Sequence, residues 1–226
     1  MEEGGRPAKL EHYRDREVAR TYGRRWSGAA GRRRNARKAR ALRRGLEILR
    51  RQGGPLATAL DLPCGQGRFT GLLRSEGLEP VGADLSLAML AEARAAWPGE
   101  RFLAADAARL PFADGAFDLV LCIRFLHLVR DPGLRRAFLM EMGRVARKAV
   151  LLDYHHGHTL RIQGRRLRHR LGLLERAPGN PSPATIRKEV GAAGLQLLAW
   201  IPVRRTPWIG EKVVLALRPE GAPAGD

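Results

Sequence analysis

Apolar residues fall into two patterns along this chain, short continuous runs and longer stretches with helical spacing. The short runs predict seven strands, at residues 56–61, 79–84, 101–105, 116–122, 148–153, 195–203 and 208–217. Helical spacing predicts helices at residues 68–76, 86–96, 132–147 and about 182–193. Ser86 and Asp131-Pro132 supply the polar cap and the first-turn proline that are typical of helix starts. This alternation predicts a doubly wound parallel α/β sheet, which binds ligands at the carboxyl ends of its strands.

The beginning and the end of the chain depart from that alternation. From Arg14 to about Arg51 the pattern is helical and basic, and the breaker Gly53-Gly54-Pro55 follows it. We therefore expect a basic helical N-terminal segment and one main domain that contains a basic insertion. The expected boundaries are 1–54 for the N-terminal segment, 55–218 for the domain, about 157–181 for the insertion and 219–226 for a disordered tail.

Charge changes this picture because the chain is strongly basic, with a formal net charge of +18. Arginine supplies almost all of the excess, and it is concentrated at residues 32–51 and 161–170. Such clusters suit an anionic partner, either an anionic membrane surface or RNA. Biased composition of the source genome explains them equally well, so both interpretations stay open.

Composition also bears on the compartment. Two cysteines, Cys64 and Cys122, do not make a disulfide framework, and no apolar run reaches the roughly 18 residues that span a bilayer. The opening Met-Glu-Glu-Gly-Gly lacks the basic and then apolar pattern of a secretory signal. We expect a cytoplasmic protein, with a peripheral position at the inner membrane surface as an option that the arginine clusters leave open.

Candidate chemistry gathers where the first three strands end. Residues 60–67, Leu-Asp-Leu-Pro-Cys-Gly-Gln-Gly, form an apolar strand that ends in an acid and enters a tight glycine loop. The second strand ends at Asp84, where a nucleotide-binding α/β unit carries its ribose-binding acid, and Asp106 follows the third strand. Asp61 directly before the loop would repel a pyrophosphate and attract an ammonium group. Asp118 precedes the fourth strand, at the wrong end for ligand contact, so we interpret it as structural.

This ordered set resembles the class I S-adenosylmethionine (SAM) dependent methyltransferases, in particular a small bacterial subgroup similar to the quinone-biosynthesis methyltransferases. The resemblance covers residues 56–153. It implies a mostly parallel, Rossmann-like sheet of seven strands with an antiparallel C-terminal hairpin. Outside the range of the resemblance, we expect the helical N-terminus with Tyr13, Tyr22 and Trp26 to act as a lid over the cofactor and to help exclude water. One departure is Pro63, which replaces a glycine of the family's loop and removes a backbone donor.

The resemblance also implies a role for each acid toward SAM. Asp61 would hold the methionine ammonium, Asp84 the ribose hydroxyls and Asp106 the exocyclic amine of adenine. The complete set of cofactor-binding candidates is Asp61, Cys64, Gly65, Gly67, Asp84, Leu85, Met89, Asp106, Ala107 and Ile123.

Candidates for the chemical step follow the fourth and fifth strands. His127 matches a histidine that is often found here in the family, and a neutral imidazole can remove a proton from a hydroxyl nucleophile. Tyr154 and His155 are further candidates for a base or for orienting the substrate. A metal site is disfavoured, since His155 and the adjacent His156 face opposite ways in an extended chain. Cys122 is interpreted as a core residue.

The leading hypothesis is therefore a SAM-dependent methyltransferase that acts on a small-molecule or lipid-like acceptor, with O- or C-methylation favoured over N-methylation. The first alternative is an RNA methyltransferase that grips its substrate with the arginine-rich segments. The second is a SAM-binding interaction module without transfer activity. The oligomeric state and the acceptor are not predicted.

Overall fold

The computed structural model describes residues 15–24, 28–204, 206 and 210–222. Within these ranges one sheet of seven strands has the order β3-β2-β1-β4-β5-β7-β6. Its strands are β1 (Thr58–Asp61), β2 (Glu79–Asp84), β3 (Arg101–Ala104), β4 (Phe117–Cys122), β5 (Ala146–His155), β6 (Leu195–Pro202) and β7 (Lys212–Pro219). The first five strands are parallel, and β7 runs antiparallel to both β5 and β6. The predicted fold class, with its C-terminal antiparallel hairpin, is confirmed.

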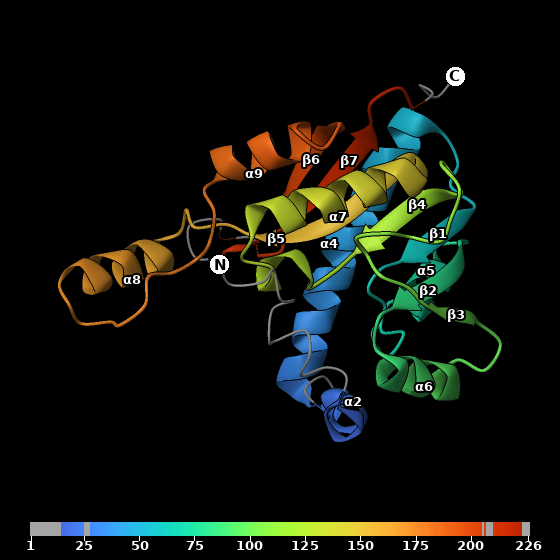
Figure 1. Ribbon diagram of the computed structural model, residues 1–226, viewed down its shortest axis with the longest axis horizontal. Coiled ribbons are helices and arrows are strands. Elements are labelled where there is room, and N and C mark those ends of the chain that lie inside the picture. Colours follow the sequence, from blue (N-terminus) through green and yellow to red (C-terminus); the bar gives the residue numbers. More distant parts are fainter. Residues whose placement is uncertain (1–14, 25–27, 205, 207–209, 223–226) are drawn as a thin grey trace.

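Helices cover both faces of the sheet, and each face has its own apolar core. On one side α7 (Pro132–Val145) and α9 (Pro183–Gly191) pack against the strands, with Phe138 and Met142 among the buried residues. On the other side α4 (Ala29–Gly53) and α5 (Thr70–Ser75) bury Leu42, Leu46 and Leu73. Figure 1 shows α7 in front of the sheet and α4 behind it. Strand β4 is buried along its whole length because both of its faces are covered, as its continuous apolar run predicts.

Polar caps place the starts of two helices where the sequence predicts them. Helix α6 (Leu87–Ala96) begins after Ser86, whose Oγ accepts a hydrogen bond from the Met89 N–H at 3.2 Å. In α7 the Asp131 side chain accepts from the Leu134 N–H at 3.0 Å, and Pro132 stands in the first turn. Each cap satisfies a backbone donor that the helix itself cannot pair.

The N-terminal segment divides into two parts with different surroundings. Helix α2 (Arg16–Tyr22) lies near the carboxyl ends of the first strands, whereas α4 is a core helix. A Cβ at Gly45 would lie 2.5 Å from Leu151 Cδ1, so the missing side chain lets α4 approach β5 closely. The separation of residues 1–54 from the domain as a lid therefore needs correction for α4, because its apolar stripe is part of the sheet's packing. Tyr13 and Trp26 lie outside the described residues.

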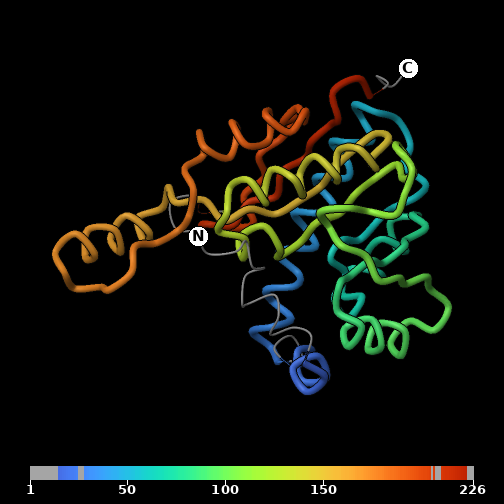
Figure 2. Tube along the Cα trace, viewed as in Figure 1, coloured from blue at the N-terminus to red at the C-terminus, as the bar shows by residue number. Residues whose placement is uncertain are grey.

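The predicted basic insertion is an arm that leaves the carboxyl end of β5. Its helix α8 (Leu160–Arg170) extends away from the body, and the chain then returns to α9 (Figures 1 and 2). At the other end of the chain, Pro219 still belongs to β7, so the predicted tail at 219–226 begins too early. Residues 223–226 lie outside the described ranges.

Candidate active site

A pocket of about 550 Å³ opens at the carboxyl ends of β1, β2 and β4. Nine of the ten cofactor-binding candidates line it, namely Cys64, Gly65, Gly67, Asp84, Leu85, Met89, Asp106, Ala107 and Ile123. The pocket lies where a doubly wound sheet leaves a crevice between neighbouring crossovers.

The loop after β1 forms one wall of the pocket through its backbone. Gly65 and Gly67 both have positive φ, 55° and 69°, a conformation that glycine adopts without steric cost. The Gly65 N–H donates to Asp84 Oδ2 at 2.8 Å, and the Ser86 N–H donates to Oδ1 at 2.9 Å. Two strand ends are thus tied together, and the Asp84 carboxylate is held facing the pocket. Burial raises the pKa of Asp84, and these N–H donors act against that rise.

Asp61 is the tenth candidate, and it lies behind the lining residues at the end of β1. Its carboxylate is buried, and Oδ2 has no hydrogen-bond partner among the described residues. Burial and, to a smaller extent, the negative charge of Asp84 raise the pKa of Asp61 to about 8, while Arg68 acts in the opposite direction. A buried carboxyl oxygen without a partner is costly, and a cationic ligand group would satisfy it.

The far end of the pocket is less polar. Asp106 follows β3, and its Oδ1 accepts from the Ala108 N–H at 3.0 Å, which leaves the Ala107 backbone at the pocket wall. Met89 from α6 and the partly exposed Leu85 lie nearby in the lining. This combination of apolar faces and one acid suits a flat heteroaromatic ring with an amino group.

Arg124 follows the end of β4 and lines the pocket with an unusual backbone conformation. It has φ +65°, and it is the only non-glycine residue with positive φ in the described part of the chain. Its N–H donates to Asp153 Oδ1 at 2.6 Å, and Asp153 Oδ2 accepts from Lys38 Nζ at 2.6 Å. Lys38 and Asp153 are both buried. Burial opposes ionisation of Asp153, but the charge of Lys38 outweighs it and lowers the pKa to about 2. The buried ion pair between Lys38 of α4 and Asp153 of β5 therefore fixes the backbone conformation of Arg124 at the pocket.

The histidine candidates lie next to this ion pair, outside the pocket lining. His127, in the short helix η2 (Leu126–Leu128), stacks on His155 with 4.1 Å between ring centroids and 21° between planes. Burial and the neighbouring His127 lower the pKa of His155 to about 3, although Asp153 acts in the opposite direction. His155 is thus a neutral imidazole at physiological pH.

Tyr154 corrects the sequence prediction. Side chains alternate along β5, so Tyr154 points to the face opposite Asp153 and His155. It is buried against α9, where its hydroxyl donates to Glu189 Oε2, and Glu189 also pairs with Arg135 of α7. Burial and the Glu189 carboxylate raise the pKa of Tyr154. A partly buried carboxylate between two helices holds the Tyr154 hydroxyl on this face, so the geometry does not support the predicted role of Tyr154 as a base or in orienting the substrate.

Several lining residues escaped the sequence analysis. Gln66 lies inside the recognised loop, and its Nε2 donates to the Ala19 carbonyl of α2, which brings Tyr22 and Gly23 to the pocket. Arg68 hydrogen-bonds to Asn35 Oδ1 of α4. Burial and the charge of Arg124 lower the pKa of Arg68 to about 10. The signal for these residues was weak, since only their place in the loop distinguishes them from other polar side chains.

Asp118 and Cys122, which the sequence analysis interpreted as structural residues, lie away from the pocket lining. Asp118 Oδ2 accepts from the Ala57 and Thr58 N–H groups at 2.8 and 3.2 Å, far from the pocket end of the strand, as expected for a structural acid. Cys122 is buried in the core.

Among the described residues no group of three or more potential ligands could hold a metal ion. No described helix has both the length and the apolar character that crossing a membrane requires.

Comparison with known proteins agrees with this geometry. A protein-family description, the methyltransferase domain, matches residues 60–152. The chain is 42% identical over 93 residues to a demethylmenaquinone methyltransferase of Beutenbergia cavernae, which covers 41% of this chain and 38% of that protein. It is 41% identical over 95 residues to a malonyl-[acyl-carrier protein] O-methyltransferase of Pseudescherichia vulneris, covering 36% and 38%. The chain thus spans less than half the length of these relatives.

A solved structure extends the likeness to most of the chain. Magnesium protoporphyrin IX methyltransferase from Synechocystis, with bound S-adenosylhomocysteine, superimposes with a TM-score of 0.69 at 19% identity. The superposition covers 94% of this chain and 99% of that one. At this identity the likeness concerns the fold.

Proposed function

We propose that the chain, whose residues 60–152 match the methyltransferase-domain family, is a class I SAM-dependent enzyme that transfers a methyl group from SAM to a small-molecule or lipid-like acceptor. The observation that carries the proposal is the acid pair at the glycine loop. Asp61 keeps a buried oxygen that has no partner in the described part of the chain, and Asp84 is held by the Gly65 N–H at 2.8 Å. One acid suits an ammonium group and the other suits a pair of hydroxyl donors.

The residues present fit SAM along the whole pocket. Asp61, buried behind the lining, would receive the methionine ammonium directly or through water. At the pocket wall the carboxylate of Asp84 would receive the ribose hydroxyls, and Asp106 with the Ala107 N–H the adenine edge. Leu85 and Met89 would pack against the adenine ring, whose burial between apolar side chains contributes affinity without a polar cost. When bound, SAM supplies a methyl group already activated on a sulfonium, so the protein's task is binding, orientation and exclusion of water.

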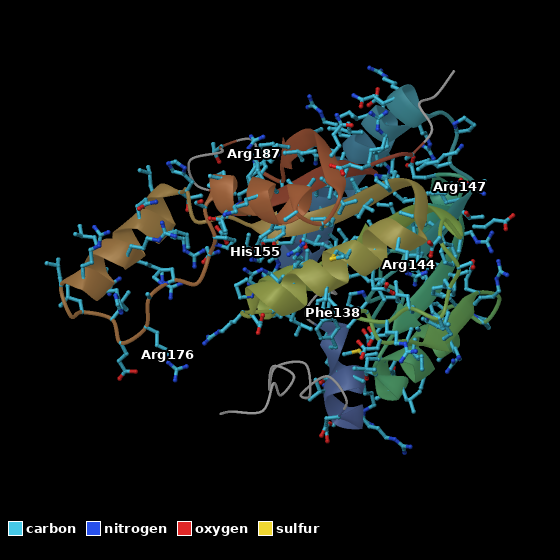
Figure 3. The ribbon with its side chains drawn as sticks, turned by 45° about the horizontal axis from the view of Figure 1, so that its top comes forward. Phe138, Arg144, Arg147, His155, Arg176 and Arg187 are labelled. Carbon is cyan, nitrogen blue, oxygen red and sulfur yellow. The ribbon has the colours of Figure 1, made fainter. Side chains whose placement is uncertain are left out.

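The acceptor side lies between the end of β4 and α7. Phe125, Leu128, Leu134 and Phe138 form an apolar wall there, and Figure 3 labels Phe138 on α7. Such a wall favours an acceptor with an apolar body. We propose O- or C-methylation, and one relative is itself named an O-methyltransferase. His127 would accept the acceptor's proton, and His155, whose pKa of about 3 makes it too weak a base for this step, would orient His127 by stacking on it.

Two measurements test this proposal. Calorimetric titration of SAM should show binding to the wild type, and Asp84→Asn should weaken it roughly 10- to 100-fold because a charged acceptor of two hydroxyl groups is lost. Glu47→Gln, an exposed acid on α4 that pairs with Arg51, is the matched control and should bind SAM like the wild type. Radiolabelled SAM incubated with fractionated cell extract should then label an organic-soluble or small polar product. Absence of SAM binding by the wild type, or full affinity in Asp84→Asn, would refute the cofactor assignment.

A further inference from the structure

Helix α8 presents an exposed apolar surface that the fold does not use. Leu160, Leu167 and Leu171 are spaced by seven and four residues, so they lie along one line of the helix. We refer to these three residues as the leucine stripe. Their exposed fractions are 72%, 57% and 64%, and Leu173 just beyond the helix is 64% exposed. Exposed leucines that gather on one helix face are unusual on a soluble surface and mark a contact site.

The opposite side of α8 anchors the arm and sets the direction of the stripe. Ile162, about 200° around the helix from Leu160, is buried. On the same far side Arg166 Nη2 donates to the Asn180 carbonyl at 2.9 Å, and on the flank of the helix Gln163 Nε2 donates to the Gly157 carbonyl at 3.1 Å. The Thr159 side chain caps the helix by accepting from the Ile162 N–H. The leucine stripe therefore faces outward because of packing on the other side of the helix.

Arginines flank the stripe on both sides. Helical spacing places Arg161 and Arg168 on one flank and Arg170 on the other, and Arg165 and Arg176 add further charge. Figure 3 shows charged side chains radiating from α8 and from the segment after it, where Arg176 is labelled. Among the described residues one ion pair reaches this helix, and it joins Arg161 to Glu211 at 3.6 Å. The surface thus combines apolar side chains with a strong, largely uncompensated positive charge.

We propose that α8 docks on the surface of a membrane that contains anionic phospholipids. The leucine stripe enters the boundary between headgroups and acyl chains, and the flanking arginines pair with lipid phosphates. An apolar face that enters this boundary and basic side chains that pair with anionic headgroups are the two features of an interfacial amphipathic helix. RNA would engage the arginines, but aliphatic leucines offer its bases no stacking surface. Because α8 leaves the carboxyl end of β5, docking brings the pocket edge of the sheet toward the lipid. The inference rests on the surface of α8 and does not require methyl transfer.

Vesicle co-sedimentation of the full chain tests this docking. The wild type should pellet with vesicles of phosphatidylcholine mixed with phosphatidylglycerol, and far less with phosphatidylcholine alone. Arg165→Gln/Arg168→Gln/Arg170→Gln should lower the apparent partition coefficient roughly a hundredfold, because each basic side chain near an anionic surface contributes severalfold. Leu160→Ser/Leu167→Ser/Leu171→Ser should lower it at least about tenfold. All six positions are exposed, five of them on α8 and Leu171 at its C-cap, and circular dichroism should show an unchanged fold.

Matched controls separate docking from general charge. Arg33→Gln/Arg40→Gln/Arg44→Gln removes the same charge from exposed positions of α4, and Met140→Ser removes an exposed apolar side chain from α7. Both controls should retain most of the vesicle binding. Equal binding of the wild type to both vesicle types overturns the proposal, as does wild-type binding by the leucine variant. Retention of a homopolymeric RNA in place of anionic vesicles also overturns it, in favour of a nucleic-acid contact.

Discussion

Asp61→Asn should stabilise the ligand-free protein while it weakens SAM binding. The Asp61 carboxyl is buried, and its pKa is raised from 3.8 to about 8, mainly by burial. At pH 7 the unfolded chain carries this group ionised and the folded chain carries it protonated. The gap between 3.8 and pH 7 corresponds to about 4 kcal/mol at 1.36 kcal/mol per pH unit. An amide of the same shape avoids this cost, so at pH 7 we expect a gain of up to about 4 kcal/mol.

The pH dependence of this gain has a definite sign. Because the folded pKa lies above the unfolded one, the folded state binds more protons between pH 3.8 and about 8. Wild-type stability attributable to Asp61 is therefore fully present below pH 3.8, falls as pH rises through this window and is constant above it. The advantage of Asp61→Asn should be absent at the acid end and largest near pH 8. Urea denaturation at several pH values measures it.

Asp61 also couples cofactor binding to proton release. An ammonium group placed against Asp61 favours the ionised carboxylate and lowers its pKa, so SAM binding to the wild type near pH 7 should release protons. Calorimetry in buffers of different ionisation enthalpy detects this release, and Asp61→Asn should abolish it together with much of the affinity. Asp118→Asn is a control for which the opposite change in stability is expected. Burial acts to raise the pKa of Asp118, but the Ala57 N–H and Arg147 outweigh it and lower the pKa, so this variant should lose stability. A less stable Asp61→Asn protein, or SAM binding without proton release in the wild type, would contradict the reasoning.

The remaining predictions concern the buried ion pair and the residues near it. Lys38→Met should destabilise the fold by about 3–5 kcal/mol, since it leaves the Asp153 carboxylate buried without its countercharge, and Lys38→Met/Asp153→Asn should recover part of this loss in urea denaturation. Lys38 holds the pKa of Asp153 in the folded protein near 2. The stability that this pair contributes should therefore be present above about pH 4 and fall toward pH 2. A stability that does not change with pH in this range would contradict the assignment. His127→Ala should lower methyl-transfer turnover more than SAM affinity. Tyr154→Phe should keep the wild-type turnover and lose about 1 kcal/mol of stability, because the hydrogen bond to Glu189 is lost. Equal turnover losses in these two variants would place Tyr154 back in the mechanism.

Local chemistry made the arrangement of the cofactor half predictable. The acids at 61, 84 and 106 follow apolar runs, and the carboxyl ends of parallel strands meet at one edge of a sheet. Helix starts at Ser86 and Asp131 were equally clear, because a cap depends on neighbours within three residues. These features need nothing from distant parts of the chain. Their binding roles remain predictions, although the pocket brings the residues together.

The acceptor half was harder to predict because its contacts join distant residues. In the sequence, Lys38 resembles the other basic residues of a solvated helix. Only the packing of α4 on β5 brings it to Asp153, which follows 115 residues later in the chain. The side to which Tyr154 points depends on strand parity, and a shift of one residue reverses it. The sequence by itself determined the order of strands and helices, the glycine loop and the acids at the strand ends, since each follows from short-range periodicity and capping. The tertiary structure alone decided which charges are buried together, which helix joins the core and where the leucine stripe points, because burial and pairing depend on elements that meet only when the chain folds.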